Sequence, residues 1–363
     1  MNQELARPEI KGIPEYIPGK TPKEPGVIKL ASNENPFGPS PKAREAITKE
    51  TKNLQIYPDQ KSTLLREALS KKLGVPDECL ICGNGSDEIM QLIAATYLNP
   101  EEEVIISEHS FSIYELVTRI FSGKLISVAL RNFEITLEGI AKAITAKTKI
   151  IWLTNPNNPT GTIFTAAEFD AFLEKVPDNI LVVVDEAYAE FVESKEFPNT
   201  INYVREGKNV IVLRTFSKFY GLAGLRIGYG IARKELIAPM YRVKMPFNVN
   251  RLAQAGALAA LEDKDFQEKT YKNNLEGKKH LYLELDKLGL EYKKSEANFI
   301  FINLKRSADQ LFMEMMKKGV IIRPLTSFGL PEAIRVSIGT REQNEKFIKA
   351  LSSLFRRGNP VAG

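Results

Sequence analysis

Cysteine and histidine are scarce in this sequence. Its 363 residues include two cysteines, Cys79 and Cys82, and two histidines, His109 and His280. The cysteines have the C-x-x-C spacing of a redox pair or of half a zinc site. A structural zinc site needs four ligands and both histidines stand alone, so we expect no metal site. Because the pair brackets an apolar Leu-Ile segment, it is more typical of small hydrophobic residues buried in a strand.

Long apolar runs and dense blocks of charge are missing as well. No apolar segment approaches the roughly 18 residues of a membrane-spanning helix, and residues 1–8 lack the apolar core of a secretory signal. We therefore expect a cytoplasmic protein. The net charge of +5 comes from 50 basic and 45 acidic residues. Because these charges are spread along the chain, no nucleic-acid-binding arm is expected.

The length and the ordinary composition predict a large domain and a smaller one. Residues 1–30 are rich in proline and glycine and predict an extended arm that packs with the small domain. Tyr16 could reach a binding site from this arm, or it could pack on its own domain. The pattern changes near Pro246. We expect a large domain over residues 31–246 and a smaller α+β domain over 247–363. In the smaller domain, strands are expected at 298–303, near 320–323 and near 334–338, with Arg323 and Arg335 at the ends of adjacent strands.

Apolar segments and helical patterns alternate through the large domain. Ser62 is expected to cap a helix that ends at Gly74. Further strands are expected at 104–107, 125–130, 149–154, 180–184 and 210–213. Further helices are expected at 89–97, 111–121 and 137–144, and another helix is expected to begin at residue 165. This alternation predicts an α/β fold with a mostly parallel sheet between two layers of helices.

Polar turns follow the strand-like segment from Cys79 to Cys82 and the last three of these strands. The first turn contains Gly85, Ser86 and Asp87 and opens a helix, where free backbone N–H groups can bind an anion. The others carry Asn158, Asp185 and Lys218. In such a sheet ligands bind beyond the carboxyl ends of the strands, so all four turns should meet at one site. The first turn lacks the third glycine of a dinucleotide fingerprint and the Gly-Lys-Ser/Thr of a P-loop, which excludes both.

The segment 214–230 carries Lys218 among apolar neighbours. A buried lysine is unfavourable unless it is paired, neutral or used covalently. Thr215, Ser217 and Arg226 are suited to holding a phosphate. A lysine that can form an imine beside a bound phosphate fits pyridoxal 5'-phosphate. The alternative is an ordinary surface lysine on a glycine-rich loop.

A pyridoxal enzyme also needs an acid at the pyridine nitrogen, which keeps the ring protonated. Asp185 suits this role because it ends an apolar strand, although a carboxylate there could instead cap a helix. Tyr188 and Asn158 can donate hydrogen bonds to the phenolic oxygen of the ring.

Several motifs together resemble one family. They are Asn-Pro-Asn-Asn-Pro-Thr-Gly at 155–161, Asp-Glu-Ala-Tyr at 185–188, Ser217-Lys218 with Arg226 eight residues later, Ser-Asn-Glu-Asn-Pro at 32–36, Tyr-Pro-Asp at 57–59 and Arg-Val-Ser-Ile-Gly-Thr at 335–340. The chain resembles the fold-type-I aminotransferases and, along nearly its whole length, the histidinol-phosphate aminotransferase family.

The resemblance implies a role for each residue. Lys218 would be the Schiff-base lysine, Asp185 the pyridinium partner, and Asn158 and Tyr188 the donors to the ring oxygen. Phe111 would stack on the cofactor. Thr215, Ser217, Arg226 and the backbone amides at Gly85, Ser86 and Asp87 would hold its phosphate. Tyr57 would reach the phosphate in the other subunit of a homodimer. The implied substrate-binding residues are Tyr16, Asn33, Arg323 and Arg335, and the substrates are histidinol phosphate and glutamate or 2-oxoglutarate.

Other functions remain open at this point. A related aminotransferase for aromatic amino acids and a threonine-phosphate decarboxylase both resemble this family. A pyridoxal-binding regulator would need an N-terminal DNA-binding domain, for which the arm leaves no room. A nicotinamide oxidoreductase is excluded by the missing fingerprint.

Overall fold

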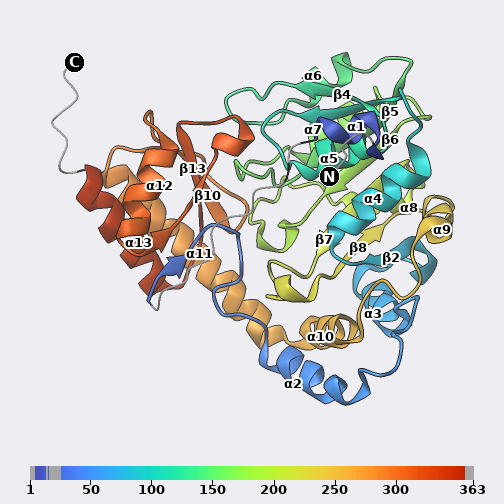
Figure 1. Cartoon of the computed structure of the whole chain (residues 1–363), viewed down its shortest axis with the longest axis horizontal. Coiled ribbons are helices and arrows are strands. Elements are labelled where there is room, and N and C mark those ends of the chain that lie inside the picture. Colours follow the sequence, from blue (N-terminus) through green and yellow to red (C-terminus); the bar gives the residue numbers. More distant parts are fainter. Residues whose placement is uncertain (1–4, 14, 16–25, 356–363) are drawn as a thin grey trace.

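The computed structural model describes residues 5–13, 15 and 26–355. Figure 1 shows two parts that lie side by side: a large sheet surrounded by helices, and a smaller sheet with its own helices near the C-terminus. The long helix α11 (Lys264–Lys287) belongs to the smaller part and extends toward the larger one. No helix in the described ranges is both long enough and apolar enough to span a membrane.

The large sheet has seven strands in the order β2-β8-β7-β6-β5-β3-β4. β8 is antiparallel to both of its neighbours, β2 and β7, and the other neighbouring pairs are parallel. The strands are β2 (Leu80–Gly83), β3 (Glu103–Ser107), β4 (Lys124–Val128), β5 (Thr148–Thr154), β6 (Leu181–Asp185), β7 (Val210–Thr215) and β8 (Gly228–Ile231). The expected α/β fold with a mostly parallel sheet is confirmed.

Both faces of this sheet are covered. Successive residues of a strand point to opposite faces, and in β6 Val182 and Val184 enter one core cluster while Leu181 and Val183 enter another. The first cluster is closed by α3 (Thr63–Leu73), α6 (Leu137–Lys142), α7 (Ala166–Leu173) and α8 (Thr200–Arg205). The second is closed by α4 (Ser86–Tyr97), α5 (Ile113–Ile120) and α9 (Lys234–Val243). Burial on both faces explains why the strands read as continuous apolar runs.

The smaller part is built on a four-stranded antiparallel sheet in the order β12-β13-β10-β9. Its strands are β9 (Glu291–Tyr292), β10 (Phe299–Asn303), β12 (Arg323–Pro324) and β13 (Ala333–Ser337). Helices α11, α12 (Ala308–Lys317) and α13 (Arg341–Phe355) pack on it around a third core cluster. Register places Arg323 directly opposite Arg335.

The remaining elements connect these parts. β1 (Ile28–Lys29) pairs with β11 (Val320–Ile321) in a two-stranded parallel sheet. Earlier in the chain, α1 (Pro8–Lys11) contacts α5, and Arg7 donates a hydrogen bond to the Ile120 carbonyl at 2.7 Å. Helix α10 (Arg251–Glu262) packs on α2 (Pro41–Glu50) and α3. Short 3₁₀ turns complete the path: η2 (Thr51–Asn53), η3 (Asp77–Cys79), η4 (Ala189–Phe191), η5 (Ala223–Leu225) and η6 (Thr326–Phe328).

Three local expectations need correction. Ser62 does not cap α3 with its side chain, because its backbone is left-handed; the Asp59 carboxylate accepts from the Thr63 N–H instead, at 2.6 Å. The helix expected from residue 111 begins at Ile113. The strand expected near 320–323 is divided into β11 and β12, which join different sheets because each pairs with a separate partner.

The two cysteines are free thiols. Cys82 lies in β2 and is buried, and burial raises the pKa of its thiol to about 12. A thiol that stays protonated is a poor nucleophile. Cys82 therefore contributes to the core as a small hydrophobic residue, as the sequence predicts. The same prediction was wrong for Cys79, which ends η3 just before the strand and is only partly buried.

Candidate active site

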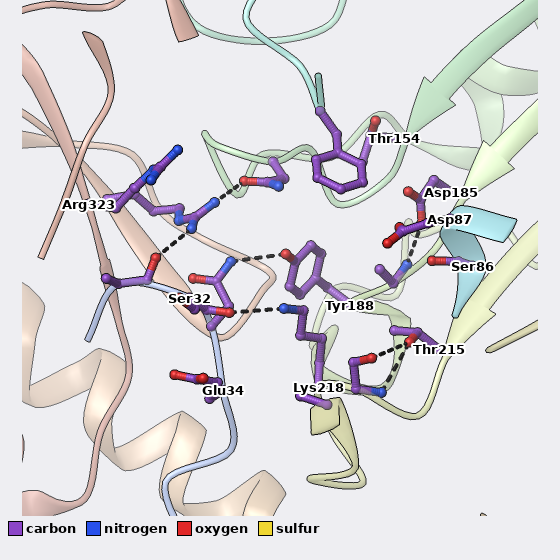
Figure 2. Close-up of a pocket in the computed structure, with 18 of the residues that line it drawn as sticks. Ser32, Glu34, Ser86, Asp87, Thr154, Asp185, Tyr188, Thr215, Lys218 and Arg323 are labelled. Carbon is purple, nitrogen blue, oxygen red and sulfur yellow. Dashed lines mark hydrogen bonds between the residues drawn. The ribbon is translucent and has the colours of Figure 1, made fainter. Parts of the chain in front are cut away.

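The four polar turns meet at one cavity beyond the carboxyl ends of β2, β5, β6 and β7. Figure 2 shows Lys218 and Tyr188 pointing into the same space. Ser86, Asp87, Asp185 and Thr215 border it from the large sheet, while Ser32, Glu34 and Arg323 lie opposite. The convergence expected from the parallel sheet is therefore present in the structure.

Lys218 follows β7 and lines the cavity. Its Nζ donates to the Ser32 carbonyl oxygen at 2.9 Å. The pKa of Lys218 is lowered to about 8, first by burial and then by the nearby Arg335 guanidinium. A lowered pKa leaves more neutral amine near neutral pH, and the neutral amine is the form that attacks a carbonyl or accepts a proton.

Asp185 is the last residue of β6 and is 3% exposed. One carboxylate oxygen accepts from the Ala187 N–H at 3.1 Å and the other from the Tyr114 hydroxyl at 2.7 Å. Burial raises the pKa of Asp185 to about 6, although both hydrogen bonds favour the ionised form. A cation held beside this carboxylate would lower its pKa again. The site suits a positively charged ring nitrogen.

Groups that can bind an anion lie close together between β7, β8 and the start of α4. Thr215 and Ser217 share a hydroxyl hydrogen bond of 3.0 Å, and the Arg226 Nη1 lies 3.4 Å from Ser217 Oγ. Because α4 begins at Ser86, its first N–H groups have no partner within the helix. Hydroxyls, a guanidinium and a helix N-terminus are groups that can bind a phosphate.

Two glycines leave room for these groups to approach one another. Gly85 has a φ of +83°, and a Cβ there would meet the Arg226 guanidinium at 2.5 Å. A Cβ on Gly228 would meet the Ser86 backbone nitrogen at 2.5 Å. Glycine thus lets the guanidinium and the helix N-terminus approach the backbone closely. In this structure Arg226 forms a salt bridge with Asp87, with 3.0 Å between Nη2 and Oδ2.

The smaller sheet contributes two arginines. Arg335 is 6% exposed; it donates to the Asn158 side-chain oxygen and, at 2.9 Å, to the Ala31 carbonyl. Arg323 lies opposite it in the register and lines the same cavity. Neighbouring guanidinium groups favour a dianion over a single carboxylate.

Asn33 joins the two sides of the cavity. Its backbone is left-handed, with a φ of 56°, and its side-chain amide donates to the Tyr188 hydroxyl at 2.9 Å. Its own N–H donates to Ser337 Oγ at 2.8 Å. The segment that contains Ser32 is thus fixed to both sheets, which explains how it reaches Lys218.

Most residues singled out from the sequence are brought together. The cavity is lined by Asn33, Ser86, Asp87, Phe111, Asn158, Asp185, Tyr188, Thr215, Ser217, Lys218, Arg226, Arg323 and Arg335. Gly85 does not line the cavity but lies next to the Arg226 side chain, which does. Tyr57 is elsewhere: it is 77% exposed and stacks on Phe247 at 4.7 Å. Tyr16 lies outside the described residues.

Seven cavity residues were not identified as site residues from the sequence: Ala31, Ser32, Glu34, Thr154, Ala187, Ala223 and Phe328. Tyr114, which contacts Asp185 from behind the cavity, was also missed. Thr154 could have been found, because it ends β5 next to the Asn158 turn. Ser32 binds through its carbonyl oxygen, which no side-chain pattern reveals.

A family model and the most similar known proteins that we compared all indicate an aminotransferase. Residues 25–351 match the family model of class I and II aminotransferases. The histidinol-phosphate aminotransferase of Moorella thermoacetica is 48% identical over 96% of this chain and 92% of its own. That of Caldicellulosiruptor saccharolyticus is 44% identical over 97% of this chain and 100% of its own.

A solved structure of the same family has a similar fold. The histidinol-phosphate aminotransferase from Sinorhizobium meliloti, in complex with pyridoxal-5'-phosphate, has a TM-score of 0.89 at 25% identity over 97% of this chain and 98% of that chain. The fold resemblance expected from the motifs is thereby confirmed. The chain belongs to the class I and II aminotransferase family and, within it, to the histidinol-phosphate aminotransferases.

Proposed function

We propose that the protein is a pyridoxal-phosphate-dependent histidinol-phosphate transaminase of histidine biosynthesis. It would exchange an amino group between L-histidinol phosphate and 2-oxoglutarate, giving 3-(imidazol-4-yl)-2-oxopropyl phosphate and L-glutamate. The observation that carries this proposal is the shared cavity, in which Lys218, Asp185 and an anion site face the paired Arg323 and Arg335. The names of the relatives support the same substrate.

The cavity residues fit pyridoxal 5'-phosphate as cofactor. Its phosphate would be held by Thr215, Ser217, Arg226 and the amides that start α4, its ring nitrogen by Asp185, and its ring oxygen by Asn158 and Tyr188. Phe111 would cover one face of the ring. The glycine cradle at Gly85 and Gly228 supports this assignment, because each added Cβ would approach the anion-binding groups to 2.5 Å. When bound, the cofactor supplies an electron sink for the carbon that bears the amino group.

Lys218 would hold the cofactor and later move a proton at the substrate carbon that bears the nitrogen. Its hydrogen bond to the Ser32 carbonyl orients the amine within the cavity. The lowered pKa near 8 lets this amine accept and return a proton close to neutral pH. Asn33 would contribute to substrate binding through the segment that also carries Ser32.

The substrate's phosphate would bind to Arg323 and Arg335. We expect the enzyme to prefer histidinol phosphate to histidinol and to phenylalanine. Arg335→Ala should remove most of this preference, about 10- to 100-fold in kcat/KM, because a hydrogen bond to a charged group is lost. Steady-state kinetics with all three amino donors measures the effect.

Arg341→Ala is the control for this substitution. Arg341 also belongs to the smaller part, but its side chain is 89% exposed and pairs with Glu345, so its loss should leave the preference unchanged. Equal kcat/KM for histidinol and its phosphate in the unmodified enzyme would contradict the substrate assignment. A higher value for phenylalanine would favour an aromatic aminotransferase, and release of CO2 from threonine phosphate would favour the decarboxylase.

We further propose a homodimer in which each subunit completes the other's site. Tyr57 is exposed and lies away from its own chain's cavity, which supports a role at the partner's cofactor phosphate. Symmetric dimers are the commonest arrangement among soluble oligomers. The proposal includes cytoplasmic location, since the substrates are intermediates of amino-acid biosynthesis.

Mixing two inactive variants tests the shared site. Lys218→Ala is mixed with a Tyr57 substitution that is severely impaired alone. If Tyr57 acts across the interface, one site of each mixed dimer carries both changes and the other carries neither, so activity should return toward half of the wild-type value. If Tyr57 acts within its own chain, both sites stay damaged. Absence of recovery despite demonstrated subunit exchange would rule out the shared site.

The domain division is also a proposal: an arm over residues 1–30, a large cofactor-binding domain over 31–246 and a small domain over 247–363. The two main sheets lie on either side of residue 246, which supports this division. Helix α10 follows the boundary in sequence and yet packs against α2 and α3. The end of the arm, at β1, pairs with β11 next to the smaller sheet.

A further inference from the structure

Behind Asp185 lies a buried tyrosine that the proposed mechanism has not used. Tyr114 is the second residue of α5 and is fully buried. Its hydroxyl donates to Asp185 Oδ2 at 2.7 Å and lies 2.9 Å from Thr154 Oγ1. Thr154 and Asp185 end the adjacent strands β5 and β6 and are register partners. One hydroxyl thus binds the ends of two strands that border the cavity.

The ring of Tyr114 is held as firmly as its hydroxyl. It stacks on Trp152 with centroids 5.3 Å apart and an interplanar angle of 9°. Its other aromatic neighbour is Phe111, in an edge-to-face contact at 5.8 Å and 86°. Phe111 lines the cavity as the expected ring-stacking residue. Tyr114 therefore contacts two of the groups assigned to the cofactor, without lining the cavity itself.

The direction of the hydrogen bond decides what Tyr114 can do. An ionised carboxylate only accepts hydrogen bonds, so Tyr114 must donate to Asp185, and Thr154 can donate to the Tyr114 oxygen. Burial and the negative charge of Asp185 raise the pKa of Tyr114 well above its usual value, which keeps the hydroxyl protonated. The geometry therefore favours a fixed donor aimed at the carboxylate.

Asp185 needs such a donor. Burial raises its pKa, and the carboxylates of Asp87 on α4 and Glu186 after β6 raise it further. The two groups that oppose this are the Tyr114 hydroxyl and the Ala187 N–H. Tyr188 is a further titratable group near this pair. Among the described residues, Tyr114 provides the side-chain hydrogen bond to Asp185.

We propose that Tyr114 is a positioning residue that keeps the Asp185 carboxylate ionised and aimed at the ring nitrogen of the cofactor. The inference rests on the proposed function and deepens it. Tyr114 acts through Asp185, because its hydroxyl is directed at that carboxylate rather than into the cavity. The alternative is that Tyr114 only fills space in the core, in which case its ring would suffice and its hydroxyl would not affect Asp185.

Tyr114→Phe separates the two ideas, because it removes the hydroxyl and keeps the ring between Trp152 and Phe111. Tyr203→Phe is a matched control: the Tyr203 hydroxyl also donates to an aspartate, Asp170 Oδ1, at 2.6 Å, but neither residue lines the cavity. Thermal unfolding of both variants shows whether they fold. The first readout uses cofactor-free protein with 13C-labelled aspartate carboxyl groups, in which Asp185 is identified by the signal lost in Asp185→Asn.

We expect the titration midpoint of Asp185 to move to higher pH in Tyr114→Phe and to stay unchanged in Tyr203→Phe. In enzyme loaded with cofactor labelled with 15N at the ring nitrogen, the NMR signal should move toward that of a neutral pyridine in Tyr114→Phe alone. The acid side of the kcat/KM profile should shift to higher pH, and kcat should fall about 10- to 100-fold, the effect of losing a hydrogen bond to a charged group.

A double variant tests whether Tyr114 acts through Asp185. In an Asp185→Asn background, Tyr114→Phe should have little further effect on kcat, because residues that act as a unit are not additive. An Asp185 titration that is unchanged in folded Tyr114→Phe would overturn the proposal, and so would a full additional loss in the double variant. If the unmodified enzyme fails to transaminate histidinol phosphate, the proposed function is wrong, whereas the titration in cofactor-free protein still tests the Tyr114 contact.

A second measurement covers the case in which Tyr114→Phe does not fold. Protein produced with 3-fluorotyrosine keeps every hydroxyl and nearly the same shape, but each hydroxyl is a stronger hydrogen-bond donor. The titration midpoint of Asp185 should then move to lower pH, since a stronger donor stabilises the carboxylate. An unchanged midpoint would contradict the proposal.

Discussion

Lys218→Ala is expected to abolish transamination, with kcat lowered by more than about 10⁴-fold, the upper end of what one general base contributes. The substitution removes both the amine that would hold the cofactor covalently and the base that would move the substrate proton. Borohydride reduction of the unmodified enzyme should fix the cofactor on the protein, and mass spectrometry should place it on Lys218. In Lys218→Ala the covalent label should be absent.

Lys278→Ala is the matched control for this experiment. Lys278 is 3% exposed and its Nζ also donates to a backbone carbonyl, that of Ser295, at 2.9 Å. It lies outside the cavity, so the label should remain on Lys218 and activity should persist if the variant folds. A label on another lysine of the unmodified enzyme would disprove the assignment of Lys218.

Asp185→Ala is expected to retain some bound cofactor but to lower kcat by about 10²- to 10³-fold, as the loss of one preorganised electrostatic partner does. Without the carboxylate, the ring nitrogen of the cofactor loses the negative charge that keeps it protonated, and the ring becomes a poor electron sink. Absorbance titration measures cofactor binding, and single-turnover kinetics with histidinol phosphate measures the chemical step.

The isosteric Asp185→Asn variant serves as the comparison for packing. It keeps the size of the side chain but removes the charge, so its activity should be as low as that of Asp185→Ala. Turnover at the wild-type rate in Asp185→Ala would show that Asp185 only anchors the turn through its hydrogen bond with the Ala187 N–H. Thermal unfolding distinguishes a loss of chemistry from a loss of stability.

Much of the fold could be predicted because the buried strands carry a strong local signal. The β6 segment is apolar along its length and buried on both faces, and the capping box of Thr165 and Glu168 marks the start of α7. The capping signal failed at the start of α3, where Asp59 competes with Ser62 for the first N–H groups of the helix. Ser62 has a good capping side chain, but Asp59 reaches the helix start while the Ser62 backbone is left-handed.

The candidate site was predicted largely as a set of side chains at strand ends. Arg323 and Arg335 were expected on adjacent strands, and the register sets them opposite each other. Contacts between residues far apart in the sequence could not be predicted. The Ser32 carbonyl meets Lys218 across 186 positions of sequence, and the Tyr114 hydroxyl meets Asp185 across 71. Neither contact leaves a local pattern, because only folding brings these groups together.

The sequence by itself determined the class of fold and the chemical groups at the ends of the strands, because both depend on patterns within a few residues. Alternating apolar segments specify buried parallel strands, and the turn that follows each strand carries its functional side chain. The tertiary structure decided how those groups are tuned. The lowered pKa of Lys218 and the raised pKa of Asp185 arise from burial and from charges on other elements, and such fields depend on distances in space, not along the chain.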